Sequence, residues 1–76
     1  MAAARGREAR SLFGENLRAQ RERAGLSQER LSALARLHRT EISLIERGRR
    51  DPRLSTVVRL ADALGVPAAS LLDEIV

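Results

Sequence analysis

The side chains with the most distinctive chemistry gather between residues 39 and 50. Two arginines, two hydroxyl residues and one carboxylate stand close together there: Arg39, Thr40, Glu41, Ser43 and Arg47. A guanidinium group bonds phosphates and base edges through a planar fork of donors, and hydroxyls can bond either partner. This combination favours recognition of a polyanion.

Two short helices are predicted to position these side chains. Apolar residues at i, i+3 and i+4 line one face of a helix that begins near residue 28, and these are Leu31, Leu34 and Ala35. Ile42 and Ile45 do the same for a helix over residues 39–47. Residues 36–38 leave room only for a tight corner between packed helices. The segment of about 27–48 therefore has the form of a helix-turn-helix, whose second helix typically enters the DNA major groove.

The distribution of charge supports a polyanionic partner. All fourteen basic residues are arginine, and the formal net charge of the 76-residue chain is +4. Residues 1–50 hold twelve arginines and six acids, a net charge of +6, whereas residues 51–76 hold two arginines and four acids, a net charge of −2. The half that contains the helix-turn-helix is thus the positive one, as expected of a double-stranded DNA-binding module.

Several function classes are excluded by composition. The chain has no cysteine and one histidine, His38, so we expect neither a disulfide nor a metal site. The carboxylates form no recognisable catalytic pair, the serines are placed as helix caps, and residues 65–67 do not form a phosphate loop. We therefore expect no enzyme, no cofactor and no small-molecule ligand. No stretch resembles a membrane span or a signal peptide, which favours a cytoplasmic protein.

The remaining segments predict an all-α fold of five helices. Residues 1–10 are expected to form a flexible basic arm that follows DNA, or a solvated tail, and residues 11–76 the folded domain. Ser11 is the expected N-cap of the first helix. Glycines stand just past three predicted helix ends, at Gly25, Gly48 and Gly65. A fourth helix opens at residue 54 or 55, and a short fifth helix is expected over residues 68 to about 74.

The residues at these positions resemble the Xre/Cro family, the helix-turn-helix family of lambda-type repressors. The resemblance covers residues 12–72 and is carried by Gly25-Leu26-Ser27-Gln28, Leu31, Arg39-Thr40, Ile42-Ser43, Ile45-Glu46-Arg47-Gly48 and Ala63-Leu64-Gly65-Val66. Residues 37–50 look most like the controller proteins of restriction–modification systems, which are small homodimers. The resemblance implies a lambda-repressor-like domain that binds a near-palindromic operator as a homodimer.

The resemblance also assigns roles to individual residues. Gln28 would contact an operator phosphate, and a scaffold ion pair would join Arg21 to Glu46. The dimer contact would lie in residues 66–76, through Ala68, Leu71 and Ile75. The DNA-facing set comprises Gln28, His38, Arg39, Thr40, Glu41, Ser43, Leu44, Arg47, Arg49 and Arg50. Leu44 either contacts a thymine methyl group or packs under the following loop.

Four positions depart from the family pattern. Ser32 stands where the family usually has alanine. Arg36 replaces a glycine in the turn, so an arginine must adopt a left-handed backbone there. His38 replaces a stronger capping residue, and Glu41 stands where controller proteins often carry an aromatic residue. Each departure weakens the controller assignment without disturbing the expected fold.

Three functions remain open at this point. The first is a transcriptional regulator of the controller type, acting at a promoter as a repressor or as an activator that contacts RNA polymerase. The second is an antitoxin- or phage-type repressor, or the DNA-binding head of a longer regulator. The third is a protein-interaction module that keeps the fold without binding DNA.

Overall fold

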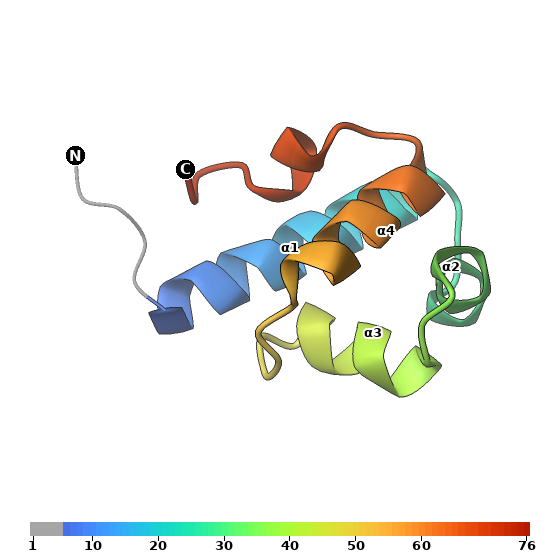
Figure 1. Cartoon of the computed structure of the whole chain (residues 1–76), viewed down its shortest axis with the longest axis horizontal. Coiled ribbons are helices and arrows are strands. Elements are labelled where there is room, and N and C mark those ends of the chain that lie inside the picture. The colour runs from blue at the N-terminus through green and yellow to red at the C-terminus, as the bar shows by residue number, and fades with distance from the viewer. Residues whose placement is uncertain (1–5) are drawn as a thin grey trace.

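A computed structural model describes residues 6–76, which form an all-α domain with no strand among them. The elements are α1 (Gly6–Arg23), α2 (Gln28–Ala35), α3 (Arg39–Glu46), α4 (Leu54–Leu64) and the 3-10 helix η1 (Ala68–Leu71). Figure 1 shows α1 and α4 crossing at the centre, with α2 at one end, α3 along one side and the C-terminal segment on the opposite side. None of these helices is both long and apolar enough to cross a bilayer.

The core lies where the helices meet. Six side chains of large volume are completely buried, and at least one comes from every element: Leu17, Leu31, Ile42, Ile45, Leu60 and Leu71. On α2 the buried face consists of Leu31, Ser32 and Ala35, whereas Leu34 is 47% exposed. The hydroxyl of Ser32 donates to the carbonyl of Glu29 at 2.7 Å, so this serine is buried without an unsatisfied polar atom.

Local signals in the sequence set most of the helix ends. The side chain of Ser27 accepts a hydrogen bond from the Arg30 N–H, which confirms it as the N-cap of α2. The three glycines expected past helix ends all have a left-handed backbone, at φ +71° for Gly25, +70° for Gly48 and +69° for Gly65. The expected start of the fourth helix, at residue 54 or 55, is also confirmed.

The expected start of the first helix is wrong. Helix α1 begins at Gly6, so Ser11 lies inside the helix and is not its N-cap. Arginine, glutamate and alanine are good helix formers. Glu8 lies in the first turn, where a carboxylate interacts favourably with the positive end of the helix dipole. Residues 6–10 of the expected arm are therefore helical, and residues 1–5 lie outside the described part of the chain.

The expected fifth α-helix is also wrong, because residues 68–71 form a single 3-10 turn. The side-chain amide of Asn16, on α1, donates to the carbonyls of Leu71 at 3.0 Å and Asp73 at 2.9 Å. These bonds hold the C-terminal segment against α1. Glu74 then adopts a left-handed backbone at φ +66°, which ends the segment.

Close approach between α1 and α3 depends on one glycine. A Cβ atom at Gly14 would lie 2.5 Å from the carbonyl oxygen of Ile45 and 2.6 Å from that of Glu46. Any side chain larger than that of glycine at this position would therefore clash with the backbone of α3. This contact holds the C-terminal end of α3 directly against α1.

Candidate DNA-binding site

A three-residue turn sets the position of α3 relative to α2. Arg36 has φ 58° and ψ 45°, so the left-handed arginine expected in this turn is confirmed. The N–H of Leu37 donates to the carbonyl of Ser32 at 2.9 Å, and the half-buried Leu37 side chain packs against the core. His38 caps α3, because its Nδ1 accepts a hydrogen bond from the Thr40 N–H at 3.2 Å.

The outer face of α3 carries the polar residues predicted to contact DNA. Ile42 and Ile45 are fully buried, so residues on the opposite side of the helix must face outward. Arg39, Thr40 and Arg47 are exposed, and Ser43 is half-buried. Together with one residue from the start of α2 they line a single polar groove, formed by Gln28, Arg39, Thr40, Ser43 and Arg47.

A buried ion pair fixes the end of α3 that lies against α1. The Nε and Nη2 atoms of Arg21 donate to the two carboxylate oxygens of Glu46 at 2.6 and 3.1 Å. Their side chains are only 12% and 4% exposed, which agrees with the expected scaffold pair. Arg21 also donates through Nη1 to the carbonyl of Leu26 at 2.9 Å, so one guanidinium joins α1, α3 and the segment before α2.

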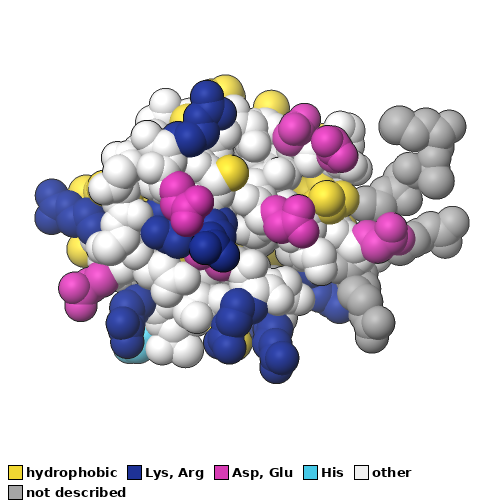
Figure 2. Space-filling view, turned by 180° about the vertical axis from the view of Figure 1, so that it is seen from behind, with side chains coloured by type: hydrophobic (Ala, Val, Ile, Leu, Met, Phe, Trp, Pro, Cys, Tyr) yellow, Lys and Arg dark blue, Asp and Glu magenta, His cyan; other side chains and the backbone are white. Residues whose placement is uncertain are grey.

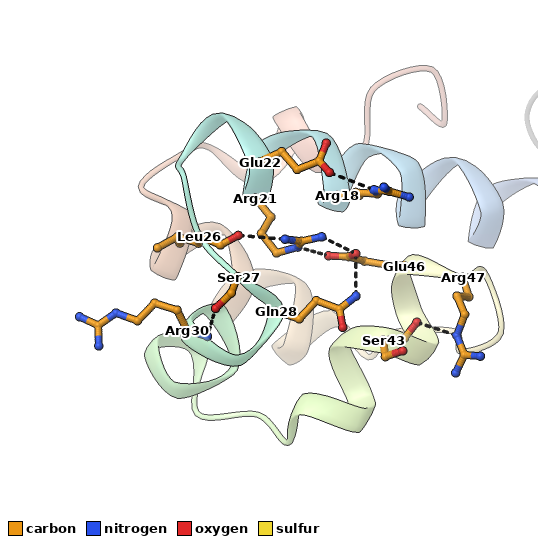
Figure 3. Close-up of polar contacts among 10 residues, drawn as sticks. All are labelled: Arg18, Arg21, Glu22, Leu26, Ser27, Gln28, Arg30, Ser43, Glu46 and Arg47. Carbon is orange, nitrogen blue, oxygen red and sulfur yellow. Dashed lines mark hydrogen bonds and ion pairs between the residues drawn. The ribbon is translucent and has the colours of Figure 1, made fainter.

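The same carboxylate orients Gln28 (Figure 3). The Nε2 atom of Gln28 donates to Glu46 Oε1 at 3.0 Å, and the oxygen of the amide points away from the pair. The hydrogen bond from Arg21 to Glu46 raises the pKa of the guanidinium above its ordinary value, so Arg21 remains charged throughout the neutral range. The carboxylate thus stays paired while it holds the Gln28 amide at the rim of the groove.

Glu41 lies on the flank of α3 and is not part of the groove. Its Oε1 accepts a hydrogen bond from Arg50 Nη1 at 2.9 Å, and their side chains are 25% and 49% exposed. Leu44 is half-buried, and its backbone carbonyl accepts from the Arg49 N–H at 2.9 Å. Glu41 and Arg50 therefore lie together beside the polar groove, and Arg49 is exposed in the adjoining loop.

Positive charge concentrates along the edge of the molecule formed by α3 and the loop after it. Figure 2 shows arginine side chains projecting from this lower edge, while most of the acidic side chains in view lie higher on the surface; further arginines lie elsewhere on this face. The arginines of α3 and the loop are all exposed, and they are Arg39, Arg47, Arg49, Arg50 and Arg53. This surface can bind the closely spaced phosphates of a DNA backbone.

One residue expected at the dimer interface is wrongly assigned. Leu71 is completely buried in the core of this domain and cannot reach a partner chain. Its neighbour Leu72 is half-buried, as are Ala68 and Ile75, and all three pack at the margin of the core. Adjacent leucines on a short helix cannot both point inward, and the sequence does not show which one does.

Two further positioning residues carry no recognisable signal in the sequence. Asn16 fastens the C-terminal segment to α1, as described above, and Arg59 of α4 bonds carbonyls at the end of α2. The Nε of Arg59 donates to the carbonyl of Ala35 at 3.2 Å, and its Nη2 donates to the carbonyl of Arg36. These partners lie 24 and 23 residues away along the chain, beyond the reach of local pattern reasoning.

In the described part of the chain, His, Asp and Glu side chains form no group of three or more that could hold a metal ion. A short capped helix with a polar outer face, preceded by a tightly turned helix and surrounded by arginines, defines a DNA-binding domain of the helix-turn-helix class.

Comparison with known proteins identifies the family. The pattern of the helix-turn-helix domain family matches residues 12–74, and the chain belongs to this family. It is a DNA-binding transcriptional regulator and not an enzyme.

Its relatives include named control proteins. The chain is 45% identical over 65 residues to the control protein C.BamHI of Bacillus amyloliquefaciens. This match covers 84% of this chain and 80% of that protein. It is 40% identical over 65 residues to the control protein C.SmaI of Serratia marcescens, covering 86% and 77%. The crystal structure of the restriction-modification controller protein C.AhdI from Aeromonas hydrophila superposes with a TM-score of 0.80 at 39% identity, covering 82% of this chain and 94% of that one. These similarities confirm the resemblance drawn from the sequence.

Proposed function

We propose that this chain is a controller-type transcriptional regulator, which binds a near-palindromic operator as a homodimer and controls genes of a restriction–modification system. The observation that carries the proposal is the polar groove of α2 and α3, in which Gln28, Arg39, Thr40 and Ser43 share one outward face. The similarity to control proteins over most of both chains supports the biological role. Such a regulator works in the cytoplasm, where its operator lies.

Each groove residue has a role in this proposal. Arg39, at the N-terminal end of α3, donates to O6 and N7 of a guanine through its guanidinium fork. Thr40 and Ser43 contact neighbouring base edges. Gln28, with one amide hydrogen bonded to Glu46 and the other free, donates to a phosphate. Arg47, Arg49 and Arg50 bind the backbone and give affinity without sequence information.

The dimer is proposed to form through the C-terminal segment. Ala68, Leu72 and Ile75 are half-buried at the edge of the core, so part of each apolar side chain remains available to a second copy. A two-fold contact there would present two α3 helices to successive major grooves, about 34 Å apart. Asp73 and Glu74 are exposed beside this segment, and contact with RNA polymerase through them is a further part of the proposal.

The test is a fluorescence anisotropy titration of the protein against two duplexes of equal length. One duplex carries the DNA upstream of the protein's own gene, and the other is the same sequence shuffled. Titrations at roughly 50 and 200 mM salt separate charge-driven binding from sequence recognition. The affinity of charge-driven binding falls steeply with salt on both duplexes, whereas sequence recognition appears as a difference in affinity between them. Arg18→Ala serves as the control variant, since it removes one exposed charge from α1, outside the groove.

We expect the upstream duplex to bind at least about a thousandfold more tightly than the shuffled one, with two protomers on each site. Arg18→Ala should retain that ratio. Equal affinity for both duplexes would overturn the assignment of a specific operator reader. Absence of binding at low salt would contradict DNA binding altogether and favour the interaction module.

A further inference from the structure

The turn between α2 and α3, which sets the direction of α3, contains a residue in an unfavourable backbone conformation. Arg36 adopts a left-handed backbone at φ 58°, a conformation that glycine accepts easily and arginine does not. Helix α2 has only eight residues and no basic side chain in its last turn. No basic side chain within this last turn is therefore available to its final carbonyls, where a cation commonly stabilises a helix C-terminus.

Arg59 supplies that cation from another element. Its Nε donates to the carbonyl of Ala35 at 3.2 Å, and its Nη2 donates to the carbonyl of Arg36. One rigid guanidinium therefore bonds the last residue of α2 and the strained residue that follows it. The planar fork fixes both carbonyls in relation to α4, which a single ammonium group could not do.

This contact bears directly on the direction of α3. Only Arg36, Leu37 and His38 separate the end of α2 from the start of α3, so the orientation of the first of these peptides is passed to the helix. Arg59 does not line the groove of α2 and α3. It lines one hollow beside the turn, with Arg36 and Asp62, and a second one that it shares with Glu41 and Arg50. Arg59 thus acts on the reading face through the turn and not by facing the same groove.

We propose that Arg59 is a positioning residue for operator recognition, which locks the strained turn so that α3 presents its side chains in register with the bases. The proposal rests on the proposed function of α3 as the reading helix. It goes beyond that function by making a residue of α4, outside the helix-turn-helix, a determinant of specificity. It also explains how this chain tolerates arginine where the turn calls for glycine.

The hydrogen bonds from Arg59 to the carbonyls of Ala35 and Arg36 are called the Arg59 clamp below. Four variants test it: Arg59→Ala, Arg59→Lys, Arg36→Gly and the double variant Arg36→Gly/Arg59→Ala. Affinities for the upstream and shuffled duplexes are measured at one salt concentration, well below each melting temperature. Arg18→Ala is again the matched control for loss of one positive charge. Amide hydrogen exchange of the DNA-free proteins reports on the turn independently, through the Leu37 and Glu41 amides, which bond the carbonyls of Ser32 and His38 at 2.9 Å each.

We expect Arg59→Ala to weaken binding to the upstream duplex about tenfold and binding to the shuffled duplex by less than about twofold. The lost hydrogen bonds orient α3 and do not contact DNA, so their loss should affect sequence recognition most. Arg59→Lys should behave similarly, because it keeps the charge without the fork. In the Arg36→Gly background the loss should shrink, since glycine holds the turn without help. The Leu37 and Glu41 amides should exchange faster in Arg59→Ala than in the unchanged protein.

Other outcomes would overturn the clamp. Equal weakening on both duplexes would make Arg59 a simple phosphate contact, and unchanged exchange in the turn would remove its positioning role. If Arg59→Ala does not fold, Arg59→Lys decides the question by the same ratio. If the unchanged protein does not discriminate between the duplexes, the proposed function fails, and hydrogen exchange still decides whether Arg59 holds the turn.

Discussion

Arg39 and Glu41 lie on different sides of α3 and have different surroundings. Arg39 is exposed and lines the groove beside Gln28, whereas Glu41 is paired with Arg50 outside it. A free guanidinium on the groove side can reach a base, while a carboxylate that is already paired is less available to one. Under the proposed function, the base-reading role therefore falls to Arg39.

Replacing Arg39 by alanine should reduce operator affinity by about 1–3 kcal/mol and relax preference at one base pair. The effect is measured with a panel of upstream duplexes, each with a single substituted base pair. The variant should lose discrimination at one position and keep it elsewhere. Uniform weakening across the panel would instead assign Arg39 to a phosphate.

Glu46 should matter more for stability than for recognition. Removing one partner of a buried pair costs about 3–5 kcal/mol, because the remaining charge stays buried. A domain of this size has roughly 4–11 kcal/mol of stability, so Glu46→Ala should be marginally folded. Urea unfolding followed by circular dichroism measures the loss. Glu22→Ala, which breaks the exposed pair with Arg18, should change stability by less than about 0.5 kcal/mol.

The pH dependence of this pair follows from the direction of the Arg21 shift. Its pKa is raised by the hydrogen bond to Glu46, so it is higher in the folded than in the unfolded protein. The contribution of the Arg21 shift is therefore fully present at neutral pH and is lost as the pH rises through that raised pKa. Arg21 itself should add no pH dependence to stability near neutrality.

At the scale of the elements, the contact between α1 and α3 makes a clear prediction. In an exposed helix, Gly→Ala usually stabilises by about 1 kcal/mol. At Gly14 the sign should reverse, because the new Cβ would lie 2.5 Å from a backbone carbonyl that cannot rotate away. We expect Gly14→Ala to destabilise the domain by about 1–3 kcal/mol, as overpacking does, measured by urea unfolding. A rise in stability would show that α1 and α3 can separate at little cost.

Prediction from the sequence succeeded where the signal was local. The caps at Ser27, the three terminal glycines and the buried isoleucines of α3 each act within a few residues, and all were placed correctly. The buried pair of Arg21 and Glu46 was found through resemblance to a family. The start of α1 was misplaced because good helix formers extend a helix without needing a cap.

Prediction failed where tertiary contacts decide the outcome. The C-terminal segment forms a 3-10 turn and is held against α1 by the amide of Asn16, more than 50 residues away, which donates to two of its carbonyls. The choice between Leu71 and Leu72 as the core residue depends on that same geometry. The clamp of Arg59 on the α2–α3 turn is likewise a contact between distant segments, invisible to local pattern.

At the scale of the whole molecule, the positive charge should set the salt dependence of binding. Each phosphate contact contributes a slope of about −0.9 in a plot of log affinity against log salt. Removing the exposed Arg49 should therefore reduce the magnitude of the slope by about one, equally for upstream and shuffled DNA. Anisotropy titrations over a salt series measure both slopes. An unchanged slope would show that the loop points away from the backbone.

The proposed dimer is a property of the whole molecule. A charge at the half-buried Ile75 would have to be desolvated in a two-fold contact, so Ile75→Asp should shift the protein toward monomer. Val76→Asp adds the same charge at a position that is 92% exposed and is the matched control. Sedimentation equilibrium measures the assembly state, and circular dichroism checks that both variants fold.

Loss of the dimer should also remove most of the operator affinity, because a monomer must bind each half-site without the tethered second one. Ile75→Asp should therefore weaken upstream binding strongly and shuffled binding little, while Val76→Asp resembles the unchanged protein. If folded Ile75→Asp sediments as the unchanged protein does, the dimer contact lies elsewhere on the surface. If the unchanged protein is monomeric even on the upstream duplex, the proposal of a homodimer on a near-palindromic operator is wrong, and recognition depends on a single α3 helix.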